Sequence, residues 1–403
     1  MPEGLSENIG YLESSQTVAI SQEAKRRRAA GEDILDLGVG EPDFPTPAAA
    51  ARAGVEAINR GMTRYPPNAG IPELRTAVAA NLSRLSDGRA VNPDDILIST
   101  GAKQSLFNTC FALFGPHDKV LIPAPAWVSY PQMVRLARAE PVLVPGSPEW
   151  GMKVGVEDLE RRVDKLTKGL IINSPCNPTG SVYTESELRS LAEWAHGHGI
   201  WLISDEIYRM ISFGSGPAAS LLNLEDELLE RAVVIYGASK AYAMTGWRIG
   251  AALGPTRLIK AMAALQSHTT SGACHPAQWA AAEAFGSETV AGDVERMVQS
   301  FRGRRDYLVE RFRTTLPGVE FVEPHGAFYF FFRIDTLIGE GGSQRFCQEL
   351  IDQAGVALVP GVAFGDDRWV RLSYAVSDDD LKKALDRIIP FIEQLSSARA
   401  AYA

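Results

Sequence analysis

The chain has 403 residues, 45% of them hydrophobic and 22% charged, and its formal net charge at pH 7 is −9. This composition is that of an ordinary globular protein and excludes a disordered chain, and the length favours two domains over one. The negative charge argues against a nucleic-acid partner, and no apolar run is long enough to span a membrane.

Helical and strand-like patterns alternate along the chain from about residue 71. Before that point, the basic run at residues 25–28 lies in a polar helical stretch and is interpreted as a solvated face. Helical periodicity follows over 71–85, 103–114, 128–138 and 184–196. Apolar runs predict strands over 95–99, 119–122, 141–144, 169–173, 200–204 and 232–236. Several of these runs are continuously apolar, as expected for strands buried on both faces of a mostly parallel sheet.

The pattern changes after about residue 290. A charged helix over 294–313 precedes short strands within 319–334 and closing helices over 344–354 and 378–396. The fold class is therefore α/β with an appended, smaller α+β domain. We expect an N-terminal arm and part of the small domain in 1–45, a large domain in 46–290 and the rest of the small domain in 291–403.

The cysteines and the first residues bear on location. Cys110, Cys176, Cys274 and Cys347 are far apart and form no Cys-x-x-Cys pair, so neither a disulfide frame nor a structural zinc site is expected. The first ten residues lack the order of a secretion signal. Together these features predict a reducing, cytoplasmic setting.

Residues 236–250 contain the group with the clearest chemistry, Lys240 among small and apolar neighbours. Desolvation lowers the pKa of an ammonium, and a neutral amine can attack an aldehyde to form a Schiff base. Arg248 adds a fixed cation, and Gly246 and Gly250 would let the backbone come close to a ligand. An amine beside a cation suits an aldehyde that carries a phosphate, as pyridoxal 5′-phosphate (PLP) does. The alternative is a solvated lysine before a core strand.

Two further segments suit the same cofactor. In Ser-Thr-Gly-Ala-Lys-Gln-Ser (99–105) a strand ends and a helix begins, so free N–H groups and the helix dipole can bind phosphate beside Gly101. In Asn-Ser-Pro-Cys-Asn-Pro-Thr-Gly (173–180), which follows a buried strand, Asn177 can donate to a phenolate oxygen. A plain Pro/Gly-rich turn is the alternative for the second segment.

Two charged residues complete the set. Asp205 ends a predicted strand, where a carboxylate can keep a pyridinium nitrogen protonated, and Tyr208 follows one turn later. Arg371 lies in an apolar strand, where its planar fork matches a carboxylate ligand. A helix cap for Asp205 and an internal ion pair for Arg371 are the alternatives.

These motifs resemble those of the fold-type I PLP enzymes of class I/II aminotransferases, and are most similar to the bacterial aspartate aminotransferase branch. The resemblance covers residues 17–392, nearly the whole chain, and its motifs occur in family order. The motifs are Gly-Glu-Pro-Asp-Phe-Pro-Thr-Pro (40–47), Asn-Pro-Thr-Gly (177–180), Ser-Asp-Glu-Ile-Tyr (204–208) and Ser-Lys-Ala-Tyr-Ala-Met-Thr-Gly-Trp-Arg-Ile-Gly (239–250). The resemblance implies a mostly parallel seven-stranded sheet between helices, plus a small domain built from both termini. It also implies a homodimer with shared active sites.

The resemblance further implies roles for individual residues. Lys240 would carry the aldimine and act as the catalytic base, with Asp205 at the ring nitrogen and Tyr208 at the ring oxygen. The other cofactor contacts implied are Gly101, Ala102, Lys103, Trp127, Asn177, Ser239, Arg248 and, from the neighbouring subunit, Tyr65. Substrate contacts are implied for Gly40, Trp127, Asn177 and Arg371.

The residues expected to select the substrate point in different directions. Lys103 stands where this branch keeps a lysine that can meet a distal carboxylate, whereas Glu13 stands where a second lysine is often found, and an acid there would repel a dicarboxylate. His268 and His275 also depart from the family pattern, either as pocket residues or as packing.

We expect transfer of the amino group of L-aspartate to 2-oxoglutarate by a ping-pong mechanism. The alternatives are a prephenate, aromatic or basic amino-acid aminotransferase, a PLP-dependent lyase, oxidase or hydroxylase, and a non-catalytic regulator. The intact Lys240 argues against the regulator.

Overall fold

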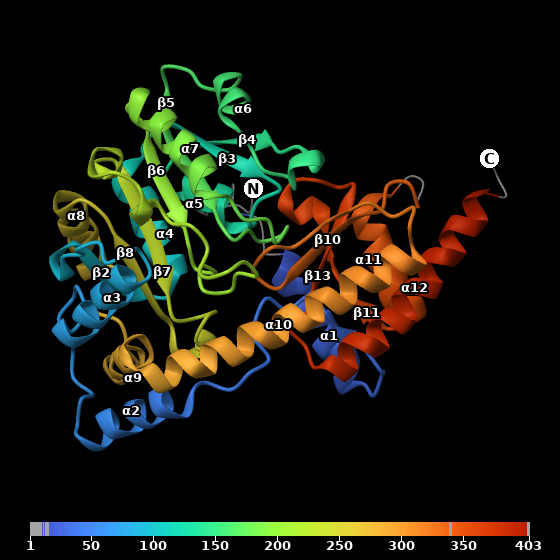
Figure 1. Cartoon of the computed structure of the whole chain (residues 1–403), viewed down its shortest axis with the longest axis horizontal. Coiled ribbons are helices and arrows are strands. Elements are labelled where there is room, and N and C mark those ends of the chain that lie inside the picture. Colours follow the sequence, from blue (N-terminus) through green and yellow to red (C-terminus); the bar gives the residue numbers. More distant parts are fainter. Residues whose placement is uncertain (1–9, 11, 13–15, 338–340, 401–403) are drawn as a thin grey trace.

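The computed structural model describes residues 10, 12, 16–337 and 341–400. The larger part is built on a seven-stranded sheet of order β2-β8-β7-β6-β5-β3-β4 (Figure 1). All the strands run in one direction except β8, which is antiparallel to its neighbours β2 and β7. The strands are β2 (Ile96–Thr100), β3 (Lys119–Ala124), β4 (Glu140–Pro145), β5 (Thr167–Asn173), β6 (Trp201–Asp205), β7 (Ala232–Gly237) and β8 (Ile249–Leu253).

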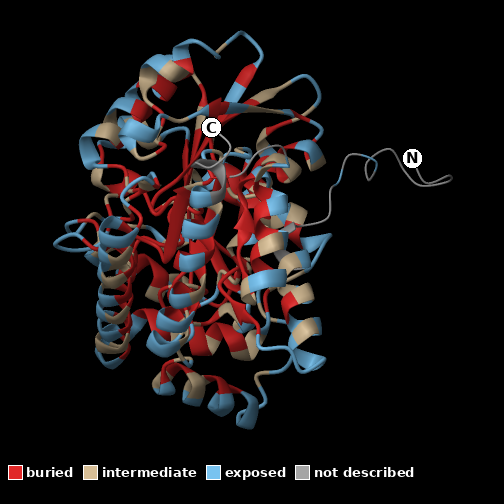
Figure 2. Cartoon of the chain, turned by 90° about the vertical axis from the view of Figure 1, so that its right-hand side faces the viewer, coloured by how far each residue is buried: buried red, intermediate tan, exposed pale blue. Residues whose placement is uncertain are grey.

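Helices cover both faces of this sheet. They are α2 (Ala48–Asn59), α3 (Pro72–Arg84), α4 (Ala102–Leu113), α5 (Ser129–Leu136), α6 (Val156–Glu160), α7 (Glu185–Gly197), α8 (Thr256–Ser267) and α9 (His275–Gly286). Leu170 and Ile172 of β5 belong to the apolar cluster under α3, α7 and α9, while Ile171 belongs to the cluster under α4, α5 and α8. This alternation follows from the two-residue period of a strand. Buried residues therefore fill the sheet layer, while the helices turn their exposed faces outward (Figure 2).

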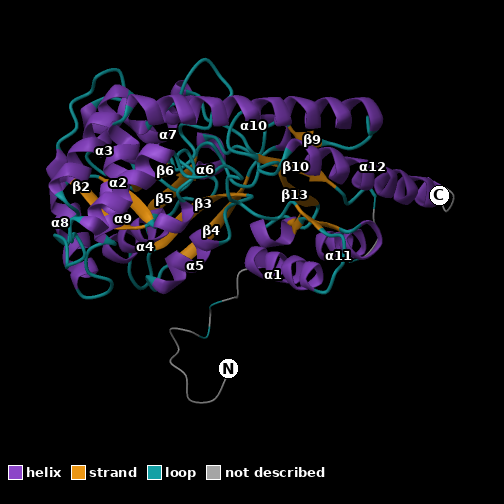
Figure 3. Ribbon diagram, turned by 90° about the horizontal axis from the view of Figure 1, so that it is seen from below, coloured by secondary structure: helices purple, strands orange, loops and turns teal. Residues whose placement is uncertain are grey.

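The smaller part combines both ends of the described chain, as expected from the sequence. In it β1 (Leu35–Asp36) pairs in parallel with β11 (Val356–Ala357). An antiparallel sheet of order β12-β13-β10-β9 contains β12 (Val359–Pro360), β13 (Trp369–Ser373), β10 (Tyr329–Arg333) and β9 (Phe321–Val322). Its helices are α1 (Gln16–Ala29), α11 (Gly342–Ala354) and α12 (Asp378–Ala400), seen on the right of Figure 3.

The long helix α10 (Glu288–Thr315) links the two parts. It starts beside α9 and extends to α12, as Figure 1 shows. The predicted division at residues 290 and 291 falls in its first turn, within a continuous helix, so the division into 1–45, 46–290 and 291–403 stays a prediction.

Most of the expected elements are present, but α2, α8 and α9 were not predicted, and the strand at β8 was expected only under the alternative given for Lys240. The residues of β8, Ile-Gly-Ala-Ala-Leu, are mostly small and make no run of branched or aromatic side chains. The strand is held by its neighbours instead, because it pairs along its length with β2 and β7.

The basic run of α1 lies on a largely solvated face, as expected, because Lys25, Arg26 and Arg28 are exposed and Arg27 is half-buried. Arg26 and Arg27 both pair with Glu23, and Arg28 donates to the carbonyl of Ile34. None of the described helices is long and apolar enough to cross a bilayer.

Candidate functional site

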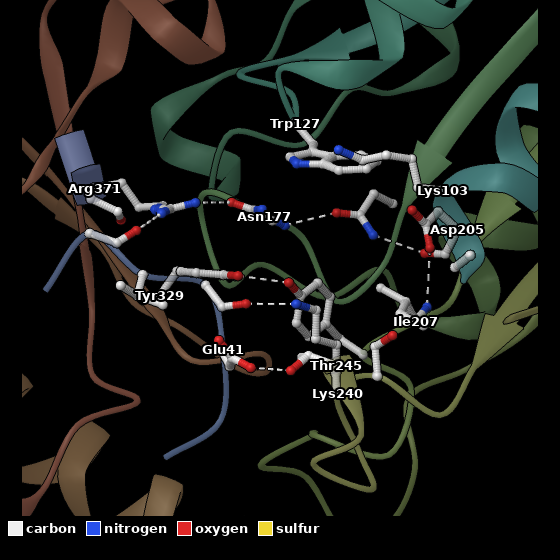
Figure 4. A pocket seen from close by; sticks show the side chains of 18 of the residues that line it. Glu41, Lys103, Trp127, Asn177, Asp205, Ile207, Lys240, Thr245, Tyr329 and Arg371 are labelled. Carbon is white, nitrogen blue, oxygen red and sulfur yellow. Dashed lines mark hydrogen bonds between the residues drawn. The ribbon is translucent and has the colours of Figure 1, made fainter. Parts of the chain in front are cut away.

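A cavity of about 520 Å³ opens where the large sheet meets the small part. It lies at the carboxyl ends of parallel strands, where α/β sheets bind ligands, and its walls follow β2, β3, β5, β6 and β7. Figure 4 shows side chains from both parts converging on it. Of the residues singled out from the sequence, those that line it are Gly40, Ala102, Lys103, Trp127, Asn177, Asp205, Tyr208, Ser239, Lys240, Arg248 and Arg371.

Lys240 reaches the cavity from the loop after β7. Its Nζ donates to the carbonyl oxygen of Gly40 at 2.6 Å. Burial lowers the pKa of Lys240 to about 8; the Glu41 carboxylate opposes this shift, and the Arg371 guanidinium adds to it. An appreciable fraction of the side chain is therefore a neutral amine near neutral pH, the form that attacks an aldehyde.

An anion-binding corner lies at the start of α4. Gly101 precedes the helix with φ 81°, and the first-turn N–H groups of Ala102 and Lys103 have no carbonyl partner within the helix. A side chain at Gly101 would overlap the guanidinium of Arg248, so the glycine lets this cation lie against the helix start. Ser239 lines the cavity from the loop that also carries Lys240. The dipole and free amides of α4, the Ser239 hydroxyl and the Arg248 guanidinium together suit a phosphate group.

The two glycines that flank Arg248 differ. A Cβ on Gly250 would overlap the backbone of Gly101 and Ala102, so this glycine permits the close packing of β8 on the helix start. A Cβ on Gly246 would meet nothing within 4 Å. Nothing in the described chain itself therefore calls for a glycine at position 246, and the expected approach of its backbone to a ligand stays a prediction.

Asp205, the last residue of β6, is buried at the opposite wall. Its Oδ2 accepts a hydrogen bond from the Tyr130 hydroxyl at 2.7 Å, and its Oδ1 accepts one from the N–H of Ile207 at 3.2 Å. Burial raises the pKa of Asp205 to about 6, and the bond from Tyr130 opposes the shift. A cationic ring nitrogen is the kind of partner that such a carboxylate lacks here.

Hydrogen bonds connect Asp205 to Arg371 across the floor of the cavity (Figure 4). Asn173 donates from its side chain to the Asp205 carbonyl at 2.9 Å and accepts from the N–H of Asn177 at 2.8 Å. The side-chain oxygen of Asn177 accepts from Arg371 at 2.8 Å. Asn173 opens the motif that contains Asn177, but no role for it was evident from the sequence.

Arg371, in β13, is buried without a carboxylate partner among the described residues. One terminal nitrogen bonds Asn177, the other bonds the Gly38 carbonyl at 2.6 Å, and its Nε has no partner. The guanidinium lies 4.5 Å from the Tyr329 ring centroid, and burial lowers its pKa. The internal ion pair considered as an alternative is thus absent from the described chain, and the buried cation suits a carboxylate ligand.

Tyr329 was missed by the sequence analysis. Its hydroxyl bonds that of Tyr208 at 2.7 Å, its ring underlies Arg371, and a Cβ on Gly40 would lie 2.6 Å from its hydroxyl oxygen. Only the β10–β13 register, with Tyr329 opposite Ser373, brings it there.

Trp127 and Lys103 form the wall across from Lys240 (Figure 4). The Lys103 ammonium lies 4.9 Å from the centroid of the Trp127 ring. Burial, and secondly the Arg248 guanidinium, lower the pKa of Lys103. Lys25 of α1, an exposed residue of the expected solvated face, also lines the cavity.

Tyr65, His268 and His275 lie elsewhere. Tyr65 is 93% exposed and outside the cavity of its own chain. His268 ends α8, and His275 contacts the Arg64 carbonyl at 3.2 Å, so neither lines the cavity. Glu13 lies outside the described residues.

The residues present fit PLP. The cavity has the volume of a small-ligand site and offers an amine with a lowered pKa, an anion-binding corner, an aromatic face and an acid to which no cation of the described chain is hydrogen-bonded. Within the described chain no cluster of His, Cys, Asp or Glu could hold a metal ion.

The sequence matches a known family model and known proteins. The model for aminotransferase class I and II matches residues 32–388. A bifunctional aspartate aminotransferase and glutamate/aspartate-prephenate aminotransferase of Petunia hybrida is 44% identical over 394 residues, which are 95% of this chain and 82% of that protein. An aspartate aminotransferase of Geobacillus stearothermophilus is 40% identical, covering 96% of this chain and 99% of its own.

Solved structures agree with these relatives. The aspartate aminotransferase of Thermus thermophilus with maleate superimposes with a TM-score of 0.91 at 40% identity, over 96% of this chain and 99% of that one. The enzyme from Rhizobium meliloti gives 0.91 at 36% identity, over 96% and 98%.

Proposed function

This chain belongs to the class I and II aminotransferases, PLP-dependent enzymes of fold type I, and from that premise we propose that it transfers the amino group of L-aspartate to 2-oxoglutarate. The observation that carries the proposal is the presence of Lys240 and Arg371 in one cavity. The first is an amine with a lowered pKa, and the second is a buried guanidinium that has no carboxylate partner among the described residues.

The chain's own residues would divide the work between them. When bound, PLP supplies an electron-withdrawing ring that stabilises negative charge on the substrate α-carbon. Arg371 binds the α-carboxylate through its planar fork, and Asn177 holds that fork in place. The Nζ of Lys240 then accepts the proton from the α-carbon. Release of one 2-oxo acid before the next enters gives the ping-pong order.

The choice of aspartate rests on charge at the cavity wall and on the relatives. Lys25 and Lys103 both line the cavity, and neither is in an ion pair among the described residues. Two cations there favour a substrate with a second carboxylate. The acid Glu41 lines the cavity too, but it accepts a hydrogen bond from Thr245.

A second candidate substrate is prephenate. The Petunia relative carries prephenate in its name beside aspartate. Prephenate is itself a dicarboxylate, so the same two lysines would favour it.

We also propose a homodimer with shared sites. Tyr65 is exposed together with Val55 and Ile58 of α2, which are 57% and 56% exposed. Exposed large hydrophobic side chains of this kind suit contact with a second copy of the chain, whose cavity Tyr65 would then reach.

A half-reaction screen tests the substrate. Each amino acid, and separately prephenate with an amino donor, is offered to the PLP-loaded protein, and the change in cofactor absorbance is followed with and without O₂. We expect aspartate and glutamate to react fastest and independently of O₂. A preference for basic or neutral amino acids would contradict the aspartate proposal, and dependence on O₂ would indicate an oxidase.

Lys240→Ala is the control for the chemistry. Borohydride should fix the cofactor on Lys240 in the wild-type protein and leave the variant unlabelled. Turnover by Lys240→Ala at a near wild-type rate would contradict the role given to Lys240.

A further inference from the structure

Tyr130, in the first turns of α5, contacts two groups of the cavity at once. Its hydroxyl donates to Asp205 Oδ2 at 2.7 Å, and its ring meets that of Trp127 edge to face, with centroids 5.3 Å apart and planes at 82°. The side chain is buried, at 3% exposure. No role was given to it from the sequence, although it follows Trp127 by three residues.

The hydrogen bond from Tyr130 opposes the effect of burial on the protonation of Asp205. A buried carboxyl group tends to take up a proton, and a neutral carboxyl cannot pair with a cationic ring nitrogen. Within the described chain the carboxylate has two donors, the Tyr130 hydroxyl and the N–H of Ile207, and the former is the shorter contact. The hydrogen bond from Tyr130 favours the ionised form of Asp205 and lowers its pKa.

Tyr130 itself cannot readily change roles. Burial raises the pKa of its phenol well above the ordinary value, and the charge of Asp205 raises it further. The hydroxyl therefore stays protonated over the working range of pH and always donates. A carboxylate oxygen has two acceptor positions, so the bond leaves each oxygen of Asp205 able to accept another donor.

We propose that Tyr130 is a positioning residue that keeps the Asp205 carboxylate ionised and aimed at the nitrogen of the cofactor ring. The inference rests on the proposed role of Asp205. Because the same ring supports Trp127, Tyr130 also sets the spacing between the aromatic face and the acid. A ligand ring held between them would be fixed at both its face and its nitrogen.

Tyr130→Phe removes the hydroxyl and keeps the ring. The apoprotein should bind PLP about 10- to 100-fold more weakly, since a hydrogen bond to a charged group is lost. With PLP labelled at the ring nitrogen, the ¹⁵N resonance of the loaded variant should move from the protonated toward the neutral position. The value of kcat should fall while KM for the amino acid changes little. The acid limb of the pH profile of kcat should move to higher pH, because the loss of the hydrogen bond lets the pKa of Asp205 rise.

Tyr183→Phe is the matched control. Tyr183 is also a buried tyrosine, and its hydroxyl accepts from the Val154 N–H at 3.0 Å and donates to the Val154 carbonyl at 3.2 Å. The Tyr183→Phe variant loses comparable hydrogen bonds away from Asp205. Its PLP affinity and its ¹⁵N resonance should therefore match those of the wild type.

A double-mutant cycle with Asp205→Asn separates positioning from packing. Tyr130→Phe should have little further effect on PLP affinity in that background. An equal loss in both backgrounds, or a ¹⁵N resonance that stays at the wild-type position, would overturn the proposal. Tyr130→His, which keeps an aromatic ring with an N–H donor, should recover part of the affinity and serves if the phenylalanine variant unfolds. Failure of the wild-type protein to bind PLP would instead sink the proposed function.

Discussion

Burial lowers the pKa of Lys240 to about 8 and raises that of Asp205 to about 6. Each shift disfavours the charged form of its group, and each group lines the same cavity. In the apoprotein, burial therefore disfavours the charged forms of both groups, and a bound cofactor would remove this cost. Lys240 would react with the aldehyde, and Asp205 would pair with the ring cation. Such strain at a functional site is a cost to stability that is recovered on binding.

The pH dependence of Asp205 gives a stability prediction. Its folded pKa of about 6 exceeds the usual 3.8, so its contribution to stability is present below pH 4 and is lost as the pH rises through 6. Asp205→Asn removes the charge and should increase the free energy of unfolding of the apoprotein at pH 7.5 by an amount on the order of 1–3 kcal/mol. The melting temperature of the variant should therefore be higher at that pH. The gain should vanish near pH 4. Calorimetry of both apoproteins from pH 4 to 8 measures this, and a lower melting temperature for Asp205→Asn at pH 7.5 would contradict it.

Residue chemistry was the part that the sequence indicated best. Lys240 and Arg371 were singled out because a charge in apolar surroundings needs a reason, and Asp205 because it ends a predicted strand. All three line one cavity. Tyr130 and Tyr329 could not be found that way. A buried tyrosine is ordinary in a core, and only the contact across the fold gives it a function.

At the scale of elements, β8 positions the anion-binding corner. It lies antiparallel between β2 and β7 and packs its Gly250 on the start of α4. The strand leads directly from Arg248, so the position of the cation and that of the helix start are set by one contact. The small residues of β8 permit this close packing. They also give β8 a weak strand signal in the sequence, because they include few branched or aromatic side chains.

The contact can be tested with two glycines in one segment. Gly250→Ala should displace the first turn of α4, weaken PLP binding at least tenfold and lower stability, because the added Cβ overlaps backbone. Gly246→Ala should leave both unchanged, since nothing lies within 4 Å of its added Cβ. Equilibrium dialysis with PLP and thermal melts compare the two variants. Equal behaviour of the pair would show that β8 does not set the corner.

At the scale of the whole molecule, the cavity needs both parts of the fold. Gly40 precedes the large sheet in sequence, Arg371 comes from β13 of the small sheet, and Lys240 and Asp205 come from the large sheet. The pairing of β1 with β11 fixes the N-terminal segment to the C-terminal part, and α10 connects the two parts. A change in their relative position would move Arg371 with respect to Lys240.

The proposed dimer with shared sites gives a prediction at this scale. Lys240→Ala and Tyr65→Ala homodimers should each be inactive or weakened. Mixed dimers should regain activity at one site, because the Tyr65→Ala subunit keeps Lys240 and receives an intact Tyr65 from its partner. Activity after unfolding and remixing the two variants, with the size of the particle measured by light scattering, tests this. A monomer, or no gain on mixing, would contradict shared sites.

The sequence by itself determined the fold class, the cofactor and the residues with unusual chemistry. These depend on local patterns, namely apolar runs, strand-end motifs and charges placed in apolar segments. The tertiary structure alone decided that Tyr130 bonds Asp205, that Asn173 and Asn177 link Asp205 to Arg371, and that Lys25 faces the cavity. The reason is physical: a hydrogen bond between residues 75 or 194 positions apart depends on how strands register and helices pack, which no local pattern records.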